Sequence, residues 1–235
     1  MTPDLAPVAD FFNAWSVYQQ VFEHNYLDHR QIAQCLNQFL QENVREPLTA
    51  LDLGCGDGVF SRRVFEGANL SAYCGVDLAE QALARAEENL QGVAPRLFFE
   101  TAEITEFMAQ TEQTFDLILA SFCLHHLDAE QKQTFLSQAR NRLNPRGRLI
   151  WVDIFRQEGQ SRENYLARYQ DIIQTHWREV DEAVKTAAFS HMAQSDYPET
   201  VSTWRTWAET LGYEIGDKLY DGAWETEQIW VLRRG

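Results

Sequence analysis

Two features of this chain have the residue types and spacing of a ligand site. In the first, Leu51 to Gly58 (L-D-L-G-C-G-D-G), glycines alternate with other residues directly after an apolar run. Glycine lets the backbone turn sharply and approach a ligand closely, because it has no Cβ. The second is Asp77, the first acid after the next apolar segment, about twenty residues on, where βαβ nucleotide sites place a ribose-binding carboxylate. Together they predict a nucleoside-binding unit.

The glycine pattern also discriminates between ligands. A dinucleotide fingerprint requires G-x-G-x-x-G or G-x-G-x-x-A, but the third small position falls on Val59 counted from Gly54 and on Ser61 counted from Gly56. The turn also lacks the G-K-[ST] of a P-loop. The remaining pattern, D-x-G-x-G-x-G with Asp77 downstream, resembles the first motif of class I methyltransferases that use S-adenosylmethionine (SAM). An ordinary glycine turn in a structural βαβ unit is the alternative interpretation.

The resemblance implies SAM as the cofactor, with S-adenosylhomocysteine (SAH) as product, and a role for each matching segment. Asp52 and the glycine turn would shape the site for the methionine part of SAM. Asp77 would accept hydrogen bonds from both ribose hydroxyls, since a carboxylate has about four lone-pair sites. The segment after the third predicted strand would border the adenine, with Glu103 at its amino group and Glu100 as a rival.

The remaining cofactor candidates lie before the first strand. Aromatic residues recur there at spacings of three or four, from Phe11 to Tyr26, which indicates a helix. In the resembled family such segments cover the cofactor, so Tyr18 and Tyr26 could meet its amino-acid end and Arg30 could pair with its carboxylate. Core packing and a solvated arginine are the alternatives. The predicted cofactor set is Asp52, Gly54, Gly56, Gly58, Asp77, Leu78, Ala102, Glu103, Ile104, Ala120, Ser121, Tyr18, Tyr26 and Arg30.

A pair of histidines, His125 and His126, follows the fourth predicted strand. Ligands bind beyond the carboxyl ends of the strands in open α/β sheets, so this pair should lie beside the transferred methyl group. An imidazole suits proton removal at neutral pH, while structural loop hydrogen bonds are the alternative. Asp153, at the end of the fifth strand, could orient an amine or hydroxyl, or cap the following segment. We expect no metal site, because no third ligand lies at helical or loop spacing near the histidines.

The expected fold class is α/β. Strands alternate with helices from Pro47 onward, which predicts a parallel sheet covered on both faces. Near the C-terminus, Tyr213 to Tyr220 and Thr226 to Leu232 are strand-like and too close together for a helical crossover, so they must run antiparallel. We therefore expect a Rossmann-like, seven-stranded, mostly parallel sheet with an antiparallel C-terminal hairpin, which is the topology of class I methyltransferases. The other predicted strands are 48–53, 72–76, 96–99, 115–120 and 148–154.

The chain should form one domain in four parts. These are an N-terminal helical cover (1–46), a SAM-binding core (47–155), a helical insertion (156–199), and a C-terminal helix with the hairpin (200–235). The insertion follows the fifth strand at the ligand-binding edge, so it is interpreted as a substrate cap. Its candidate substrate residues, each of which could equally be packing, are Tyr165, Tyr169, His176, His191 and Tyr197.

Composition narrows the function further. The 235 residues are 45% hydrophobic and 23% charged, as in globular proteins, and the net charge is −15. Such an acidic chain offers no basic stripe for nucleic acid or an anionic membrane. The four dispersed cysteines indicate reduced thiols in the cytoplasm, and the N-terminus has neither the basic region nor the apolar core of a secretory signal.

The sequence thus predicts a SAM-dependent methyltransferase of a small metabolite, acting by in-line displacement on an unspecified N, O, C or S atom. A non-catalytic SAM-binding or scaffolding protein, a protein-substrate methyltransferase and an NAD-dependent oxidoreductase are the alternatives. The sequence does not distinguish a monomer from a homodimer.

Overall fold

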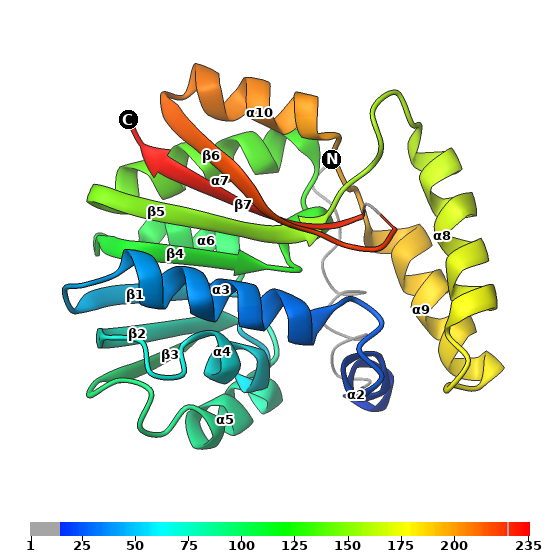
Figure 1. The fold of residues 1–235 in the computed structure, drawn as a ribbon, viewed down its shortest axis with the longest axis horizontal. Helices are drawn as coiled ribbons and strands as arrows, with labels where there is room; N and C mark the ends of the chain where they lie inside the picture. The colour runs from blue at the N-terminus through cyan, green and yellow to red at the C-terminus, as the bar shows by residue number, and fades with distance from the viewer. Residues whose placement is uncertain (1–14, 225) are drawn as a thin grey trace.

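The computed structural model describes residues 15–224 and 226–235, and the early part of the predicted N-terminal cover, including Phe11, lies outside them. One sheet of seven strands crosses the molecule in the order β3-β2-β1-β4-β5-β7-β6 (Figure 1). Strands β1 to β5 pair in parallel, whereas β7 runs antiparallel to both β5 and β6. This confirms the expected fold class. The strands are β1 (Leu48–Leu53), β2 (Leu70–Asp77), β3 (Leu97–Thr101), β4 (Phe115–Ser121), β5 (Leu143–Ile154), β6 (Tyr213–Asp221) and β7 (Glu227–Arg234).

Helices cover both faces of the sheet, because successive strand residues point to opposite sides. In β1, Leu51 and Leu53 pack into one buried cluster with helices α6, α7 and α10. Leu48 and Ala50 pack into another with α3, α4 and α5. The helices are α2 (Trp15–Glu23), α3 (His29–Asn43), α4 (Val59–Val64), α5 (Glu80–Asn89), α6 (Ile104–Gln110), α7 (Ala129–Arg142), α8 (Arg162–His176), α9 (Glu182–Ser195) and α10 (Val201–Thr210).

Helices α8 and α9 lie beyond the carboxyl ends of the parallel strands, beside α2 (Figure 1). Apolar residues of these three helices form a third buried cluster that includes Val21, Ile173 and Met192. The insertion between β5 and α10 is therefore packed against the N-terminal helices. The insertion covers part of the region beyond the carboxyl ends of the parallel strands.

Two local features differ from the expected elements. The N-terminal helical stretch is divided between α2 and α3, because Asn25 and Asp28 adopt positive φ angles of 59° and 53°. The fifth strand begins earlier than the predicted range 148–154, because β5 starts at Leu143, and its pairing with β4 shifts register between Phe115 and Leu117. Arg146 in that segment has a φ of 70°.

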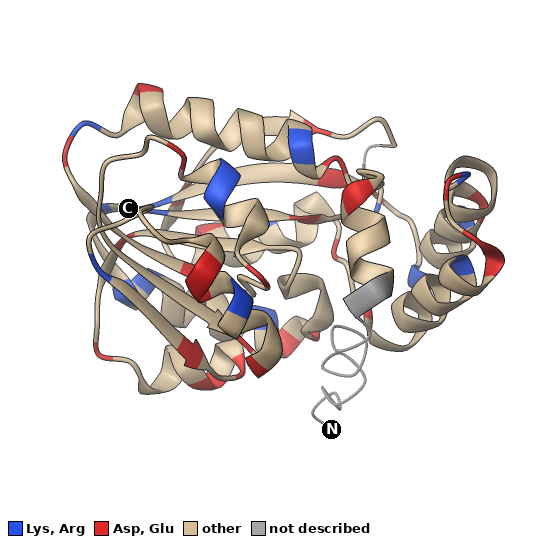
Figure 2. Ribbon diagram, turned by 90° about the horizontal axis from the view of Figure 1, so that it is seen from below, with Lys and Arg blue, Asp and Glu red and all other residues tan. Residues whose placement is uncertain are grey.

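Basic residues are dispersed among acidic ones along the ribbon (Figure 2). Among the described helices, none is both long and apolar enough to cross a membrane.

Candidate active site

A cavity lies where the parallel strands end. Its lining comes from the loops after β1, β2, β3 and β4, from the end of β5, and from α2, α8 and α9. Gly54, Gly56 and Asp77 lie on its wall, and so do His125 and Asp196. The predicted nucleoside-binding unit and the histidine pair therefore face one continuous space.

The glycine turn is held open by its backbone. Gly54, Gly56 and Gly58 all have positive φ angles, of 69°, 54° and 74°. A Cβ on Gly54 would lie 2.8 Å from the Cβ of Cys123, and one on Gly58 would lie 2.8 Å from Leu90. A Cβ on Gly56 would instead meet nothing nearer than the hydroxyl of Tyr18, at 4.0 Å. Gly54 and Gly58 thus allow close packing, whereas Gly56 keeps space free on the cavity wall.

Asp77 is fixed by two backbone amides. Its Oδ2 accepts from Gly56 N at 2.8 Å, and its Oδ1 accepts from Ala79 N at 2.9 Å. Burial raises the pKa of this carboxyl, and the backbone hydrogen bonds oppose the rise. Each oxygen keeps a further lone-pair site. A rigid carboxylate on the cavity wall with two acceptor sites left fits the two hydroxyls of a ribose.

Glu103 and Ile104 also line the cavity. Oε2 of Glu103 accepts from the amides of Thr105 and Glu106, at 2.8 and 2.9 Å, and so caps α6. Leu78 and Ser121 are on the wall as well. The sequence predicted these four residues as cofactor contacts, and all four line the cavity.

Four predicted cofactor residues do not line the cavity. Asp52 is fully buried, and its Oδ2 accepts from the hydroxyls of Ser61 and Tyr73, so it ties β1 to α4 and β2. Burial raises the pKa of Asp52 to about 6. Ala102 donates its amide to the Asp77 carbonyl at 3.1 Å, and Ala120 is buried inside β4. Gly58 likewise packs against α5 rather than facing the cavity.

Of the three N-terminal candidates, one lines the cavity and two do not. Tyr18 lines the cavity. The ring of Tyr26 stacks on Trp177 with centroids 4.7 Å apart, and Arg30 is exposed and donates to the Glu23 carbonyl at 2.6 Å. The expected contacts of Tyr26 and Arg30 with a cofactor are therefore not supported by their positions. Tyr26 packs on another side chain, and Arg30 donates to the protein's own backbone.

His29, the residue before Arg30, faces the cavity in its place, and it was not predicted as a site residue from the sequence. It lines the cavity, and its ring lies 4.8 Å from that of Phe22 and 5.0 Å from that of Phe122. Burial lowers the pKa of His29 to about 3, so its imidazole is neutral. The helical period offered a signal, because His29, Ile32 and Leu36 share the buried face of α3.

At the other end of the cavity, a short 3-10 turn (Leu124–His126) presents both histidines. Nδ1 of His125 lies 2.5 Å from Oδ1 of Asp153, whose Oδ2 accepts from the His125 amide and from Nε1 of Trp151, both at 3.0 Å. Burial opposes a charge on His125, but the neighbouring Asp153 and Asp196 outweigh it and raise its pKa. Asp153 lies behind His125 and fixes its ring, rather than lining the cavity itself.

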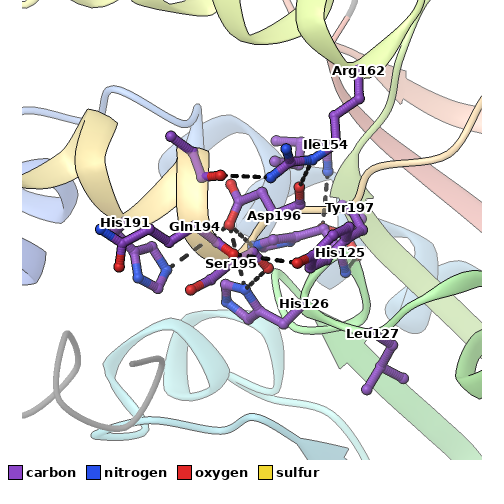
Figure 3. Close-up of polar contacts among 12 residues, drawn as sticks. His125, His126, Leu127, Ile154, Arg162, His191, Gln194, Ser195, Asp196 and Tyr197 are labelled. Carbon is purple, nitrogen blue, oxygen red and sulfur yellow. Dashed lines mark hydrogen bonds and ion pairs between the residues drawn. The ribbon is translucent and has the colours of Figure 1, made fainter. Parts of the chain in front are cut away.

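Asp196, just after α9, completes this cluster and was absent from the sequence predictions. Its Oδ1 lies 3.4 Å from Nδ1 of His126, 3.8 Å from Nε2 of His125 and 3.9 Å from Nε2 of His191 (Figure 3). Burial lowers the pKa of His126, and that of His191 to about 4. Nothing in the local sequence marks Asp196, because the chain returns to the histidines only after three intervening helices and a strand.

Of the five candidate substrate residues, two line the cavity and three do not. Tyr169 and His191 line the cavity. Tyr165 is buried against the ring of Tyr169, His176 is exposed against Trp224, and Tyr197 lies under the guanidinium of Arg162. The last three do not reach the cavity, because α8 and the segment after α9 turn them toward other parts of the protein. The apolar wall consists instead of residues such as Val21, Leu27, Trp177, Ala188 and Met192.

Residues 51–149 match the family model described as a methyltransferase domain. The carboxy-S-adenosyl-L-methionine synthase of Shewanella amazonensis is 28% identical over 148 residues, which are 61% of this chain and 59% of that protein. The malonyl-[acyl-carrier protein] O-methyltransferase of Halalkalibacterium halodurans is 30% identical over 128 residues, 52% of this chain and 46% of that protein. The chain thus spans about half the length of these curated relatives.

Two solved structures extend the likeness to nearly the whole fold. Magnesium protoporphyrin IX methyltransferase from Synechocystis PCC 6803 with bound SAH has a TM-score of 0.69 at 15% identity, covering 99% of this chain and 100% of that one. The plantazolicin methyltransferase BpumL with SAH has a TM-score of 0.67 at 15% identity, covering 98% and 95%. Residues 51–149 thus match a methyltransferase domain, and the fold of the chain is that of class I SAM-dependent methyltransferases.

Proposed function

We propose that this protein transfers a methyl group from SAM to a small molecule held between the sheet edge and helices α8 and α9. The observation that carries the proposal is the continuity of the cavity. It joins the glycine turn and Asp77 at one end to the cluster of His125, His126 and Asp196 at the other. A methyl donor in the first half would present its sulfonium toward an acceptor in the second.

The cofactor half would hold SAM through groups already in place. Gly56 leaves room for the methionine part, Asp77 would accept from the ribose hydroxyls, and Glu103 with Ile104 would border the adenine. Tyr18 and His29 line the same half and would approach the amino-acid end. When bound, SAM supplies a methyl group already activated by its sulfonium, so positioning the acceptor in line provides much of the rate.

The acceptor half is apolar with one polar patch. Trp177, Ala188 and Met192 lie on the wall contributed by the segment 156–199, which we interpret as a substrate cap. The polar patch is the cluster around Asp196. We infer an acceptor with an apolar body and one hydroxyl or amine that meets this cluster, where Nε2 of His125 could receive its proton.

The four cysteines form no disulfide, which is compatible with a reducing compartment such as the cytoplasm, where we place the reaction. Binding is tested first, by calorimetry with SAM and SAH and with NAD as the comparison ligand. Transfer is then tested by incubating the protein and methyl-labelled SAM with a metabolite extract and identifying the labelled product. We expect SAH and SAM to bind, NAD not to bind, and the label to appear on a small molecule. Absence of heat with both SAM and SAH on folded protein would refute the proposal, and binding without transfer would favour a non-catalytic SAM-binding protein.

A further inference from the structure

The cluster at the acceptor end contains three ligand atoms arranged for a metal ion. We propose that His125, His126 and Asp196 bind a divalent cation of the zinc type. The binding itself is independent of methyl transfer. Its role in activating the acceptor rests on the proposed function.

The spacing of the ligand atoms is the first argument. Oδ1 of Asp196 lies 3.8 Å from Nε2 of His125 and 3.4 Å from Nδ1 of His126, and one ligand atom from each of the three residues lies within 4.8 Å of the others. Zinc–ligand bonds of about 2.0–2.2 Å in a tetrahedron separate neighbouring ligand atoms by roughly 3.4 Å. A shift of about 1 Å in these side chains would therefore bring the three ligand atoms within bonding distance of one ion.

The support behind His125 is the second argument. Its Nδ1 lies 2.5 Å from Oδ1 of Asp153, which places the ring proton on Nδ1 and leaves the lone pair of Nε2 facing Asp196. A metal-binding histidine almost always donates its other ring N–H to a carboxylate, a carbonyl or water. Asp153 is itself fixed by the His125 amide and the indole of Trp151. The orientation that a metal ligand needs is thus built into β5.

The third argument is the buried carboxylate. Asp196 is 2% exposed, and its Oδ1 has no hydrogen-bond partner among the described residues. Its contacts with the three histidines are 3.4–3.9 Å long, so the buried charge is only loosely paired, and a bound cation would pair with it directly. Nδ1 of His126 lies 3.3 Å from the Ser195 carbonyl, a contact that a metal bond would replace.

The donor set favours zinc-like ions over harder ones. Two imidazole nitrogens with one carboxylate and an open fourth position match catalytic zinc sites, whereas Mg²⁺ and Ca²⁺ prefer oxygen ligands. The site faces the cavity, so the acceptor could take the fourth position. A cation there lowers the pKa of a hydroxyl, whose proton leaves to water. The oxygen lone pair then forms the new C–O bond as the S–CH₃ bond breaks, and SAH leaves with the former bonding electrons.

The test uses untagged protein freed of metal by chelation and dialysis. Zn²⁺ and Co²⁺ salts alone are titrated by calorimetry, and Co²⁺ is also followed by its visible absorption. We expect one equivalent to bind, with the stronger visible bands of a four-coordinate cobalt site. Asp196→Asn and His126→Ala should each weaken binding at least tenfold, and Asp153→Asn about 10- to 100-fold through its effect on His125. His24→Ala and Asp171→Asn, on the exposed surface, should bind as the parent protein does.

SAH binding to each variant serves as the folding control and separates this proposal from the proposed function. Loss of metal binding in Asp196→Asn with SAH affinity retained supports the site. No saturable binding of either metal by folded parent protein overturns it, and so does binding that survives both Asp196→Asn and His126→Ala. Equal methyl transfer by chelated and Zn²⁺-loaded protein would overturn the activating role and assign Nε2 of His125 to proton removal. Metal binding without any SAH binding would leave the site standing while the proposed function fails.

Discussion

The backbone amide of Gly56 donates a hydrogen bond to Oδ2 of Asp77 at 2.8 Å, which links the turn after β1 to the end of β2. The glycine and the acid that the sequence singled out separately are therefore one unit. The orientation of the carboxylate depends on the conformation of the turn. The oxygen that holds the turn is also one of the two available to a ribose.

Replacing Asp77 should weaken cofactor binding. We expect Asp77→Ala to lower SAH affinity by more than tenfold, because two hydrogen bonds to a charged acceptor are worth roughly 1.5 kcal/mol or more each. Asp77→Asn keeps one acceptor oxygen and should lose less. Calorimetry with SAH measures both, and Glu87→Ala, exposed on α5, is the control. Unchanged affinity in Asp77→Ala would place the ribose elsewhere.

A methyl group on Gly56 should act on the ligand as well as on the backbone. Gly56 and Gly92 have positive φ angles of 54° and 81°, and a Cβ on Gly92 would meet nothing within 4 Å. Each change to alanine should cost about 1–2 kcal/mol of stability through its backbone. Only Gly56→Ala should also weaken SAH binding, because its Cβ would enter the cavity. Equal SAH affinity of the two variants would contradict this assignment of the cavity wall.

Removal of the His125 imidazole should separate turnover from cofactor binding. We expect His125→Ala to reduce methyl transfer by about 100-fold or more, whether the ring takes a proton or holds a cation. SAH affinity should stay near that of the parent protein, because His125 lies at the acceptor end. Initial rates with labelled SAM and calorimetry with SAH provide the two readouts. Undiminished turnover would remove His125 from the mechanism.

The buried carboxyl of Asp52 should make stability depend on pH. Burial raises its pKa from 3.8 to about 6 in the folded protein. Between these values the folded state binds more protons than the unfolded chain, so the contribution of Asp52 to stability falls as pH rises through this window. A shift of about two units corresponds to roughly 3 kcal/mol.

Asp52→Asn should abolish that contribution. Its free energy of unfolding is measured in urea from about pH 4 to about pH 7. Relative to that of the parent protein, this free energy should increase as pH rises. Asp171→Asn, on the exposed surface of α8, should follow the parent curve throughout. A constant difference between Asp52→Asn and the parent would show that Asp52 keeps an ordinary pKa.

Much of the cofactor half could be predicted from the sequence, because its determinants are local. The turn Gly54 to Gly58 follows its strand directly, and positive φ angles at these positions require glycine. Asp77 ends the neighbouring strand, so parallel pairing alone brings it to the turn. The antiparallel hairpin of β6 and β7 followed from the short connection between them.

The acceptor half could not be predicted in the same way. His125 and His126 were found from their position after β4, but their partner Asp196 lies after α9 and reaches them only through the packing of α8 and α9 against the sheet edge. The expectation of no metal site considered only ligands near the histidines in the sequence, whereas Asp196 is distant from them in the chain. The choice between His29 and Arg30 likewise depended on which face of α3 is buried.

The sequence by itself determined the alternation of strands and helices, the glycine turn and the acid that ends the next strand, because short-range backbone geometry and the periodicity of apolar residues specify them. Only the tertiary structure decided which side chains face the cavity and which carboxylate meets the histidines. Those choices depend on how separate helices pack, and packing brings together residues whose spacing along the chain carries no information about their contact.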